Sequence, residues 1–235
     1  MNASYGLINV WAQGDLVTRA VLLILLAMSL ASWMVMLVKL LALRQLRAHA
    51  RGLERFWHGK DFALGVLGLG PAGNPFHALA VEGLKAARHV QTSPGQAPEL
   101  HARFDLSDWV TRCLRNSVDD STARLQAGLA VLASAGSTAP FVGLFGTVWG
   151  IYHALMSIGL AGQASIDKVA GPIGEALIMT ALGLAVAIPA VLGYNALVRA
   201  NKAVLARLNR FAHDLHAYFV TGARVEPAPA AASGA

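Results

Sequence analysis

Three long uncharged runs dominate the pattern of apolar and polar positions along this chain of 235 residues. The first run, residues 20–38, lies between Arg19 and Lys39. A helix of this length spans about 28 Å, close to the roughly 30 Å hydrocarbon core of a bilayer. A cleaved signal peptide fits less well, because no Lys or Arg precedes Arg19 and the run exceeds the usual apolar length. We therefore predict a retained transmembrane helix over residues 20–38.

The second uncharged run covers residues 125–166. As one helix it would measure about 63 Å, twice the hydrocarbon thickness. We therefore expect span 2 with a cytoplasmic extension over residues 128–160, entered directly from a helix over residues 103–127. Pro140 lies inside this run, where a proline can kink a helix.

The third run, residues 169–198, carries one charge, Glu175. Proline is favoured at the first position of a helix, so Pro172 predicts that span 3 begins there and extends over residues 172–198.

The distribution of basic residues predicts the orientation of the three spans. Basic residues cluster after span 1 and after span 3, at Lys39, Arg44, Arg47, Arg51 and Arg55 and at Arg199, Lys202, Arg207 and Arg210. Cytoplasmic loops carry such an excess of Lys and Arg. The segment 39–127 and the helix 199–221 are therefore predicted to be cytoplasmic, and residues 1–19 and the loop 161–171 periplasmic.

Glycine and proline divide the predicted cytoplasmic segment. The Gly/Pro-rich stretches Gly65–Pro75 and Thr92–Pro98 flank a helical pattern over Phe76–Val90. The Ala- and Pro-rich tail, residues 222–235, is predicted to be disordered.

Composition supports lipid as the solvent of the three runs. Charged residues make up 14% of the chain, against about 25% in soluble domains. The formal net charge of +6 does not indicate nucleic-acid binding, because the basic residues of segment 39–127 are mixed with acids. Cys113 is the only cysteine and can form no internal disulfide. The prediction is an all-α, three-span membrane protein whose long helices extend into the cytoplasm.

Spans 2 and 3 each carry a face of small residues around one threonine. These residues are Pro140, Gly143, Thr147, Gly150 and Ala154 in span 2, and Ala176, Thr180, Gly183 and Ala187 in span 3. In antiparallel spans that meet near residue 165, Thr147 and Thr180 lie within about 5 Å of the same depth. Several copies around one axis would then form a hydrophilic ring. The alternative is that the threonines bond their own backbone and the small residues only pack the helices.

Glu175 and His153 are the ionisable candidates in spans 2 and 3. A carboxylate in a membrane usually faces a cavity or a partner. In the first turn of a helix, however, Glu175 could simply interact with the helix dipole. His153 is either a proton relay or an interfacial packing residue. Threonine does not titrate near neutral pH, so a proton carrier would have to come from a second chain. The sequence has no GxSxG or HExxH motif, so we expect no enzyme and no metal site.

The runs APFVGLFGTVWGIYHAL (139–155) and GPIGEALIMTALGLAVAIPAVLGYNALVR (171–199) resemble the signature of the MotA/TolQ/ExbB proton-channel family. The resemblance covers roughly residues 10–215 and places the family's pore-facing threonines on Thr147 and Thr180 and its glutamate on Glu175.

What the resemblance implies is a bacterial inner-membrane ring, expected to be a pentamer. Its pore holds the transmembrane helices of two ExbD-like subunits, each with an aspartate that carries protons, and a TonB-like protein lies at the periphery. No cofactor is implied, since protons are what is transported.

The resemblance also leaves rival functions. The amino-acid sequences of spans 1 and 3 favour an ExbB-type subunit over a TolQ-type subunit. A MotA-type subunit, with four spans, fits less well. A passive membrane scaffold is the rival from another class.

Overall fold

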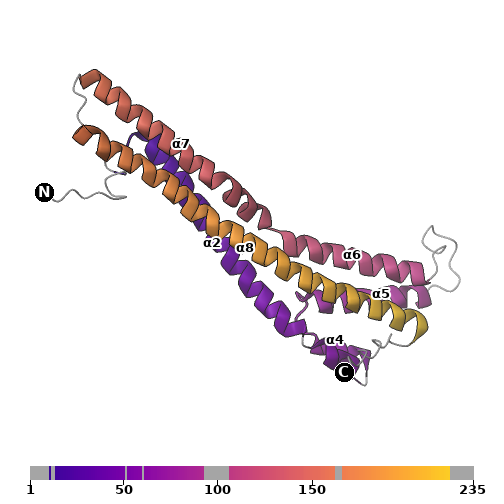
Figure 1. Ribbon diagram of the computed structural model, residues 1–235. Helices are drawn as coiled ribbons and strands as arrows, with labels where there is room; N and C mark the ends of the chain where they lie inside the picture. The colour runs from indigo at the N-terminus through magenta and orange to yellow at the C-terminus, as the bar shows by residue number, and fades with distance from the viewer. Residues whose placement is uncertain are drawn as a thin grey trace, which may run out of the picture. The chain divides into compact units, whose positions relative to one another are not determined.

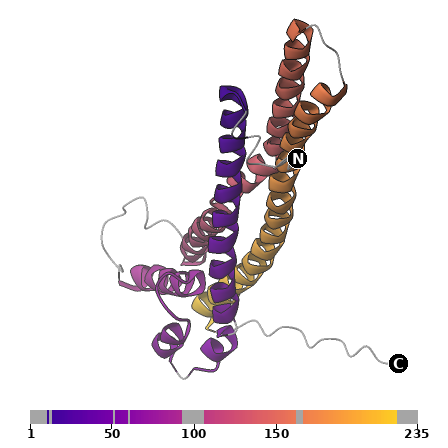
Figure 2. The same ribbon diagram turned by 90° about the vertical axis from the view of Figure 1, so that its left-hand side faces the viewer.

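The computed structural model describes residues 11, 14–50, 52–59, 61–92, 106–161 and 166–222, and in these residues it contains helices and no strand. The helices are α2 (Leu16–Ala50), α3 (Leu53–Trp57), α4 (Phe62–Gly68), α5 (Pro75–Thr92), α6 (Leu106–Gln126), α7 (Leu129–Ala161) and α8 (Ile166–Thr221). The predicted all-α class is therefore confirmed. Figure 1 labels most of these helices, and Figure 2 shows α2 unbroken in indigo and violet.

Three stretches of the described residues are long and apolar enough to cross a membrane: Leu16–Trp57, Leu106–Met156 and Gly171–Thr221. α8 has 56 residues and is about 84 Å long, so only part of it fits within a bilayer of about 30 Å. The boundaries of the predicted spans relative to a membrane, and the side on which each terminus lies, stay predictions.

The chain divides into two compact units. Unit 1 comprises Met1–Leu41 and Gly128–Arg199, and thus the first part of α2, α7 and the first part of α8. Its core joins all three helices through Val21 and Leu25 of α2, Ala139 of α7, and Met179 and Ala187 of α8. Most other large side chains of α2 between residues 23 and 38 are apolar and exposed, as expected of a helix in lipid.

Unit 2 comprises Ala42–Ala127 and Ala200–Ala235. Its buried core includes Phe56, Phe76, Leu114 and Phe211. The rings of Phe56 and Phe211 pack edge to face with centroids 5.3 Å apart. This core joins α3, α5 and α6 to the last part of α8.

The helix that contains span 3 does not begin at Pro172, as the proline predicted. α8 begins at Ile166, so Pro172 lies inside the helix and part of the predicted loop 161–171 is helical. An internal proline removes only one backbone hydrogen bond, and membrane helices tolerate this loss when neighbouring groups satisfy the freed carbonyl. Residues 162–165 lie outside the described residues.

The predicted break at Gly65–Pro75 is also partly wrong, because α4 includes Gly65. A side chain at Gly65 would place its Cβ 2.9 Å from the Phe56 ring, so this glycine permits close packing within unit 2. The predicted helix Phe76–Val90 is confirmed by α5. Of the break predicted at Thr92–Pro98, only Thr92 lies within the described residues; residues 223–235 also lie outside them.

The helix predicted over residues 103–127 does not run directly into span 2. α6 ends at Gln126, and Gly128 adopts φ +80° before α7 begins at Leu129. Glycine adopts this left-handed conformation without steric strain, which explains why the helix stops there. Residues 103–105 lie outside the described residues.

Candidate functional site

The small-residue faces of α7 and α8 pack directly against each other in unit 1. A Cβ on Gly143 would lie 2.6 Å from the Met179 carbonyl oxygen, and one on Gly183 would lie 2.6 Å from the Ala139 carbonyl oxygen. Both distances are too short for any side chain, so glycine is what allows the two backbones to approach.

Thr147 and Thr180 meet within this close contact. Their Oγ1 atoms are 2.5 Å apart and hydrogen-bonded. Thr147 is 7% exposed, whereas Thr180 is partly exposed. The two hydroxyls, 33 residues apart in sequence, therefore lie at one depth, as their positions in the two spans predicted.

The Thr147 hydroxyl also reaches two backbone carbonyls. Its Oγ1 lies 3.1 Å from the Gly143 oxygen on its own helix and 3.1 Å from the Ala176 oxygen on α8. One hydroxyl proton serves one acceptor at a time. When Thr147 donates to a carbonyl, Thr180 donates to Thr147, which gives a short chain of exchangeable hydroxyl protons. The alternative prediction, that Thr147 bonds the backbone of its own helix, is thus also met. A role of Thr147 in lining a pore stays a prediction.

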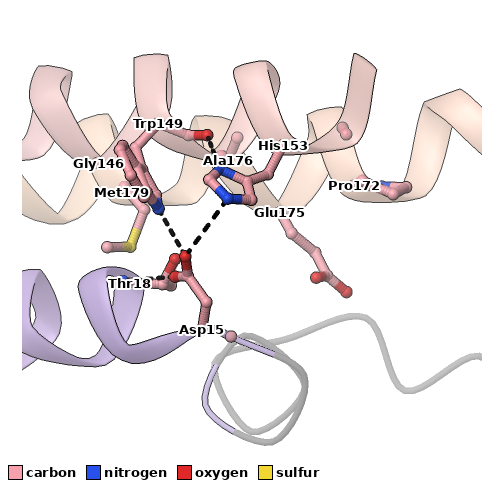
Figure 3. Close-up of a pocket in the computed structure, with 12 residues that line it drawn as sticks. Asp15, Thr18, Gly146, Trp149, His153, Pro172, Glu175, Ala176 and Met179 are labelled. Carbon is pink, nitrogen blue, oxygen red and sulfur yellow. Dashed lines mark hydrogen bonds and ion pairs between the residues drawn. The ribbon is translucent and has the colours of Figure 1, made fainter. Parts of the chain in front are cut away.

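A cavity of about 360 Å³ lies next to the threonine pair in unit 1. It is lined by residues from the beginning of α2, from α7 and from α8, namely Gly14, Asp15, Thr18, Gly146, Trp149, Gly150, His153, Ala154, Pro172, Glu175, Ala176 and Met179. Ala176 connects the two features, because it lines the cavity and its carbonyl faces the Thr147 hydroxyl. Figure 3 shows this cavity.

Asp15 lies at the centre of the polar contacts in Figure 3. Its Oδ1 accepts the Thr18 backbone N–H at 2.9 Å, and its Oδ2 accepts the Trp149 indole N–H at 2.6 Å. His153 Nε2 is 4.0 Å from the same Oδ2, which makes an ion pair when the imidazole is protonated. The His153 ring packs against the Trp149 ring with centroids 4.6 Å apart.

The pKa of Asp15, which precedes α2, is lower than usual. Burial alone would raise this pKa, but the hydrogen bonds from Thr18 and Trp149 and the charge of His153 together outweigh that effect. The carboxylate form of Asp15 is thus the form that the surrounding groups stabilise.

Glu175 lines the same cavity from α8 and is partly buried. Because α8 begins at Ile166, Glu175 lies more than two turns inside the helix. The interaction of a charge with the helix dipole is confined to the first turn. The interpretation of Glu175 as a first-turn residue is therefore wrong, and its place on the cavity wall is what the structure shows.

Asp15 was not identified from the sequence. The available signal was that Asp15 is the only Asp or Glu among residues 1–53 and lies four residues before Arg19, which bounds the first uncharged run. The sequence alone does not distinguish Trp149 from an interfacial tryptophan, and only the fold shows that its N–H is bonded to Asp15. Among the described residues, no group of three or more His, Cys, Asp or Glu could hold a metal ion.

Three apolar helices, with a paired hydroxyl site and a cavity bearing carboxylates where they pack, define a multi-span α-helical membrane protein. The chain belongs to the MotA/TolQ/ExbB proton channel family, whose model matches residues 78–210. This match includes Thr147, Glu175 and Thr180, and it confirms the family indicated by the sequence.

Sequence identity to individual relatives differs between the ExbB and TolQ branches of this family. The chain is 45% identical over 218 residues to "Biopolymer transport protein ExbB" of Xanthomonas campestris, covering 91% of this chain and 86% of that protein. It is 42% identical to the protein of the same name in Neisseria meningitidis, covering 88% and 94%. The identity to "Tol-Pal system protein TolQ" of Pseudomonas aeruginosa is 34%, covering 88% and 89%. The chain is thus more similar to these ExbB proteins than to that TolQ protein.

Proposed function

We propose that this chain is the proton-channel (stator) subunit of a TonB–ExbB–ExbD complex in the bacterial inner membrane. It couples the proton motive force to TonB-dependent uptake of siderophores, haem or vitamin B12 across the outer membrane. The observation that carries this proposal is the 42–45% identity to two proteins named ExbB over about nine-tenths of the chain. The lower identity to a TolQ protein makes a Tol-Pal function the weaker candidate.

The local geometry supports a path for protons along α7 and α8. The Thr147–Thr180 hydroxyl pair and Glu175 lie on neighbouring parts of the two helices, joined by the cavity wall at Ala176. Hydroxyls bind and relay protons through hydrogen bonds but do not store them at neutral pH. The proton carrier in this proposal is therefore an aspartate on an ExbD-like transmembrane helix.

The proposed assembly is a homopentamer around a central pore, with two ExbD-like helices inside the pore and a TonB-like protein at the periphery. The N-terminus is periplasmic and the C-terminus cytoplasmic. A charge that crosses the membrane potential gains about 2.3 kcal/mol per 100 mV, so each proton delivers useful work if its passage is coupled to helix motion. Thr147, Thr180 and Glu175 line the path in this arrangement.

Substitution of Glu175 tests the proposed function. Glu175→Ala should abolish TonB-dependent uptake while the chain still co-purifies with its ExbD-like partner, and Glu175→Asp should retain partial uptake because it keeps the carboxylate. Glu82→Ala is the matched control, since Glu82 is a surface acid of unit 2 whose partner Lys85 is 67% exposed.

The outcomes separate a channel subunit from a passive scaffold. A scaffold would support full uptake with Glu175→Ala as long as the complex assembles, and this result would remove Glu175 from the mechanism. Loss of co-purification would make Glu175 structural. Growth on a TonB-dependent iron source, compared with detergent sensitivity of the envelope, distinguishes the ExbB-type function from the TolQ-type function.

A further inference from the structure

The carboxylate of Asp15 connects two helices, one oxygen to each. Oδ1 accepts the Thr18 N–H in the first turn of α2, as a helix cap does. Oδ2 accepts the indole N–H of Trp149 on α7, 134 residues away in the sequence. A helix cap requires only the contact with Thr18. Capping of α2 therefore does not explain the contact with Trp149.

The α7 residues that Asp15 contacts are the ones that line the cavity beside the threonine pair. Trp149 lies two residues after Thr147, and His153 lies one turn further along the same helix. Both line the cavity together with Glu175 of α8. The position of Asp15 therefore affects the part of the cavity wall that Trp149 and His153 form (Figure 3).

We propose that Asp15 is a positioning residue of the proton pathway, and that it holds Trp149 and His153 at the cavity more firmly when His153 is protonated. Asp15 has this role only if the chain conducts protons as proposed above. With a neutral imidazole, the Trp149 hydrogen bond is the contact of Oδ2 with α7. With a protonated imidazole, an opposite charge 4.0 Å away adds a second contact.

The other charged groups near this contact are Arg19 on α2 and Glu175 on α8. On α2, Arg19 donates from Nε to the Trp11 carbonyl at 3.2 Å and lies over the Trp11 ring. On α8, the charged side chain lining the cavity is Glu175. On α7, it is His153. His153 is thus the described titratable group on α7 that faces Asp15.

The side chains of Asp15 and His153 are 38% and 51% exposed. Exposed ion pairs contribute little to folding stability. The contact is therefore expected to make the transport rate depend on the outer pH. If Asp15 were only a helix cap, its loss would lower the transport rate by the same factor at every pH.

Asp15→Asn keeps the cap and removes both contacts with α7. Asparagine caps helices about as well as aspartate, but it carries no charge and has one acceptor oxygen in place of two, so a capping asparagine no longer accepts the indole N–H of Trp149. His153→Gln removes only the contact with the imidazole and keeps the Trp149 hydrogen bond. Asp108→Asn, an exposed aspartate in α6, is the matched control for removal of one negative charge.

The experiment is proton uptake into proteoliposomes that contain the chain with its ExbD-like partner, at outer pH values between about 5 and 8, where imidazoles change charge. At the acidic end, His153→Gln should reduce the rate by up to about fivefold, the factor that corresponds to an exposed ion pair. Its rate should approach that of the wild type at the alkaline end. Asp15→Asn should be slower than the wild type at every pH, with the larger loss at the acidic end, because the Trp149 contact is lost at every pH. The double variant should be no slower than Asp15→Asn, which already removes the His153 contact.

Rates of Asp15→Asn that equal the wild type, or rates of His153→Gln that equal it or fall by one factor at every pH, would overturn the proposal. If Asp15→Asn does not assemble with the partner, Asp15→Glu decides: a recovered pH response supports the proposal, and assembly without that response overturns it. Glu175→Ala is measured in parallel. Blocked uptake with Glu175→Ala and an unchanged profile with Asp15→Asn would reject the role of Asp15 alone. Undiminished uptake with Glu175→Ala would reject the role proposed for Glu175, and no proton uptake by the wild type would reject the proposed function and the role of Asp15 together.

Discussion

Thr147 carries a closely packed hydroxyl between α7 and α8. It is 7% exposed and lies within hydrogen-bonding distance of two carbonyls and of Thr180. A buried hydroxyl with several alternative partners can change partner without leaving an unsatisfied group. This property suits a proton path, and it also satisfies the packing of two membrane helices.

Replacement of each threonine by valine should separate transport from packing. Thr147→Val and Thr180→Val keep the side-chain volume, so we expect a loss of about 1 kcal/mol of stability at most and nearly normal assembly. Energy transduction should be impaired in both, because each variant interrupts the hydroxyl pair. Uptake assays and co-purification with the ExbD-like partner measure the two effects.

Thr138→Val is the control for this pair. Thr138 is exposed on the same helix and bonds only the carbonyl of Ser134 among its described contacts. Normal uptake in both Thr147→Val and Thr180→Val would make the pair a packing contact.

The lowered pKa of Asp15 predicts how stability depends on pH. Because the folded pKa lies below the unfolded pKa, Asp15 stabilises the fold above its unfolded pKa, and this contribution is lost as the pH falls through the folded value. Thermal unfolding in detergent should therefore show a smaller loss of stability on acidification in Asp15→Asn than in the wild type. If the wild type and Asp15→Asn lose the same stability over this acidic range, the lowered pKa of Asp15 is contradicted.

At the scale of elements, α7 and α8 depend on glycines where their backbones meet. Gly143 and Gly183 lie opposite each other, with their Cβ positions already occupied by backbone atoms of the facing helix. Backbone atoms cannot rotate away as a flexible side chain can. The spacing of the two helices, and with it the hydroxyl pair, is therefore set by these residues.

Gly143→Ala should separate the helices and destabilise unit 1 by about 1–3 kcal/mol, the usual range for an overpacked contact. Gly159→Ala on the same helix is the control, since its Cβ would have no neighbour within 4 Å. It should be neutral or stabilising by up to about 1 kcal/mol. Thermal unfolding of both variants in one detergent checks the difference, and equal midpoints would show that the helices can separate without loss.

At the scale of the whole molecule, large apolar side chains remain exposed on all three apolar helices of unit 1. They include Leu30 and Met34 on α2, Phe141 on α7, and Leu184 and Leu192 on α8. Such surface is compatible with lipid and with contacts between copies of the chain. In the proposed ring, α7 and α8 lie inside and α2 faces lipid.

Native mass spectrometry of the purified chain in detergent should show a homo-oligomer, with five copies as the expected number. The prediction follows from a path for protons that needs a closed ring around the ExbD-like helices. A stable monomer under conditions that preserve binding of the ExbD-like partner would rule this arrangement out. Addition of that partner should increase the mass without changing the number of copies.

The sequence by itself determined the fold class, the three apolar spans and the family. Uncharged runs of the required length have few stable solutions in lipid, because every backbone polar group must be bonded within a helix. The positions of Thr147 and Thr180 at one depth also followed from residue counting, since the rise of a helix is constant.

The tertiary structure decided where helices begin and which distant residues meet. Pro172 resembled a helix start, but α8 begins at Ile166, because local preference for proline does not prevent a helix from continuing. Asp15 and Trp149 are separated by 134 residues, and no periodicity within either segment encodes their contact. Only the packing of α2 on α7 places the carboxylate beside the indole and the imidazole, and with them at the cavity that Glu175 lines.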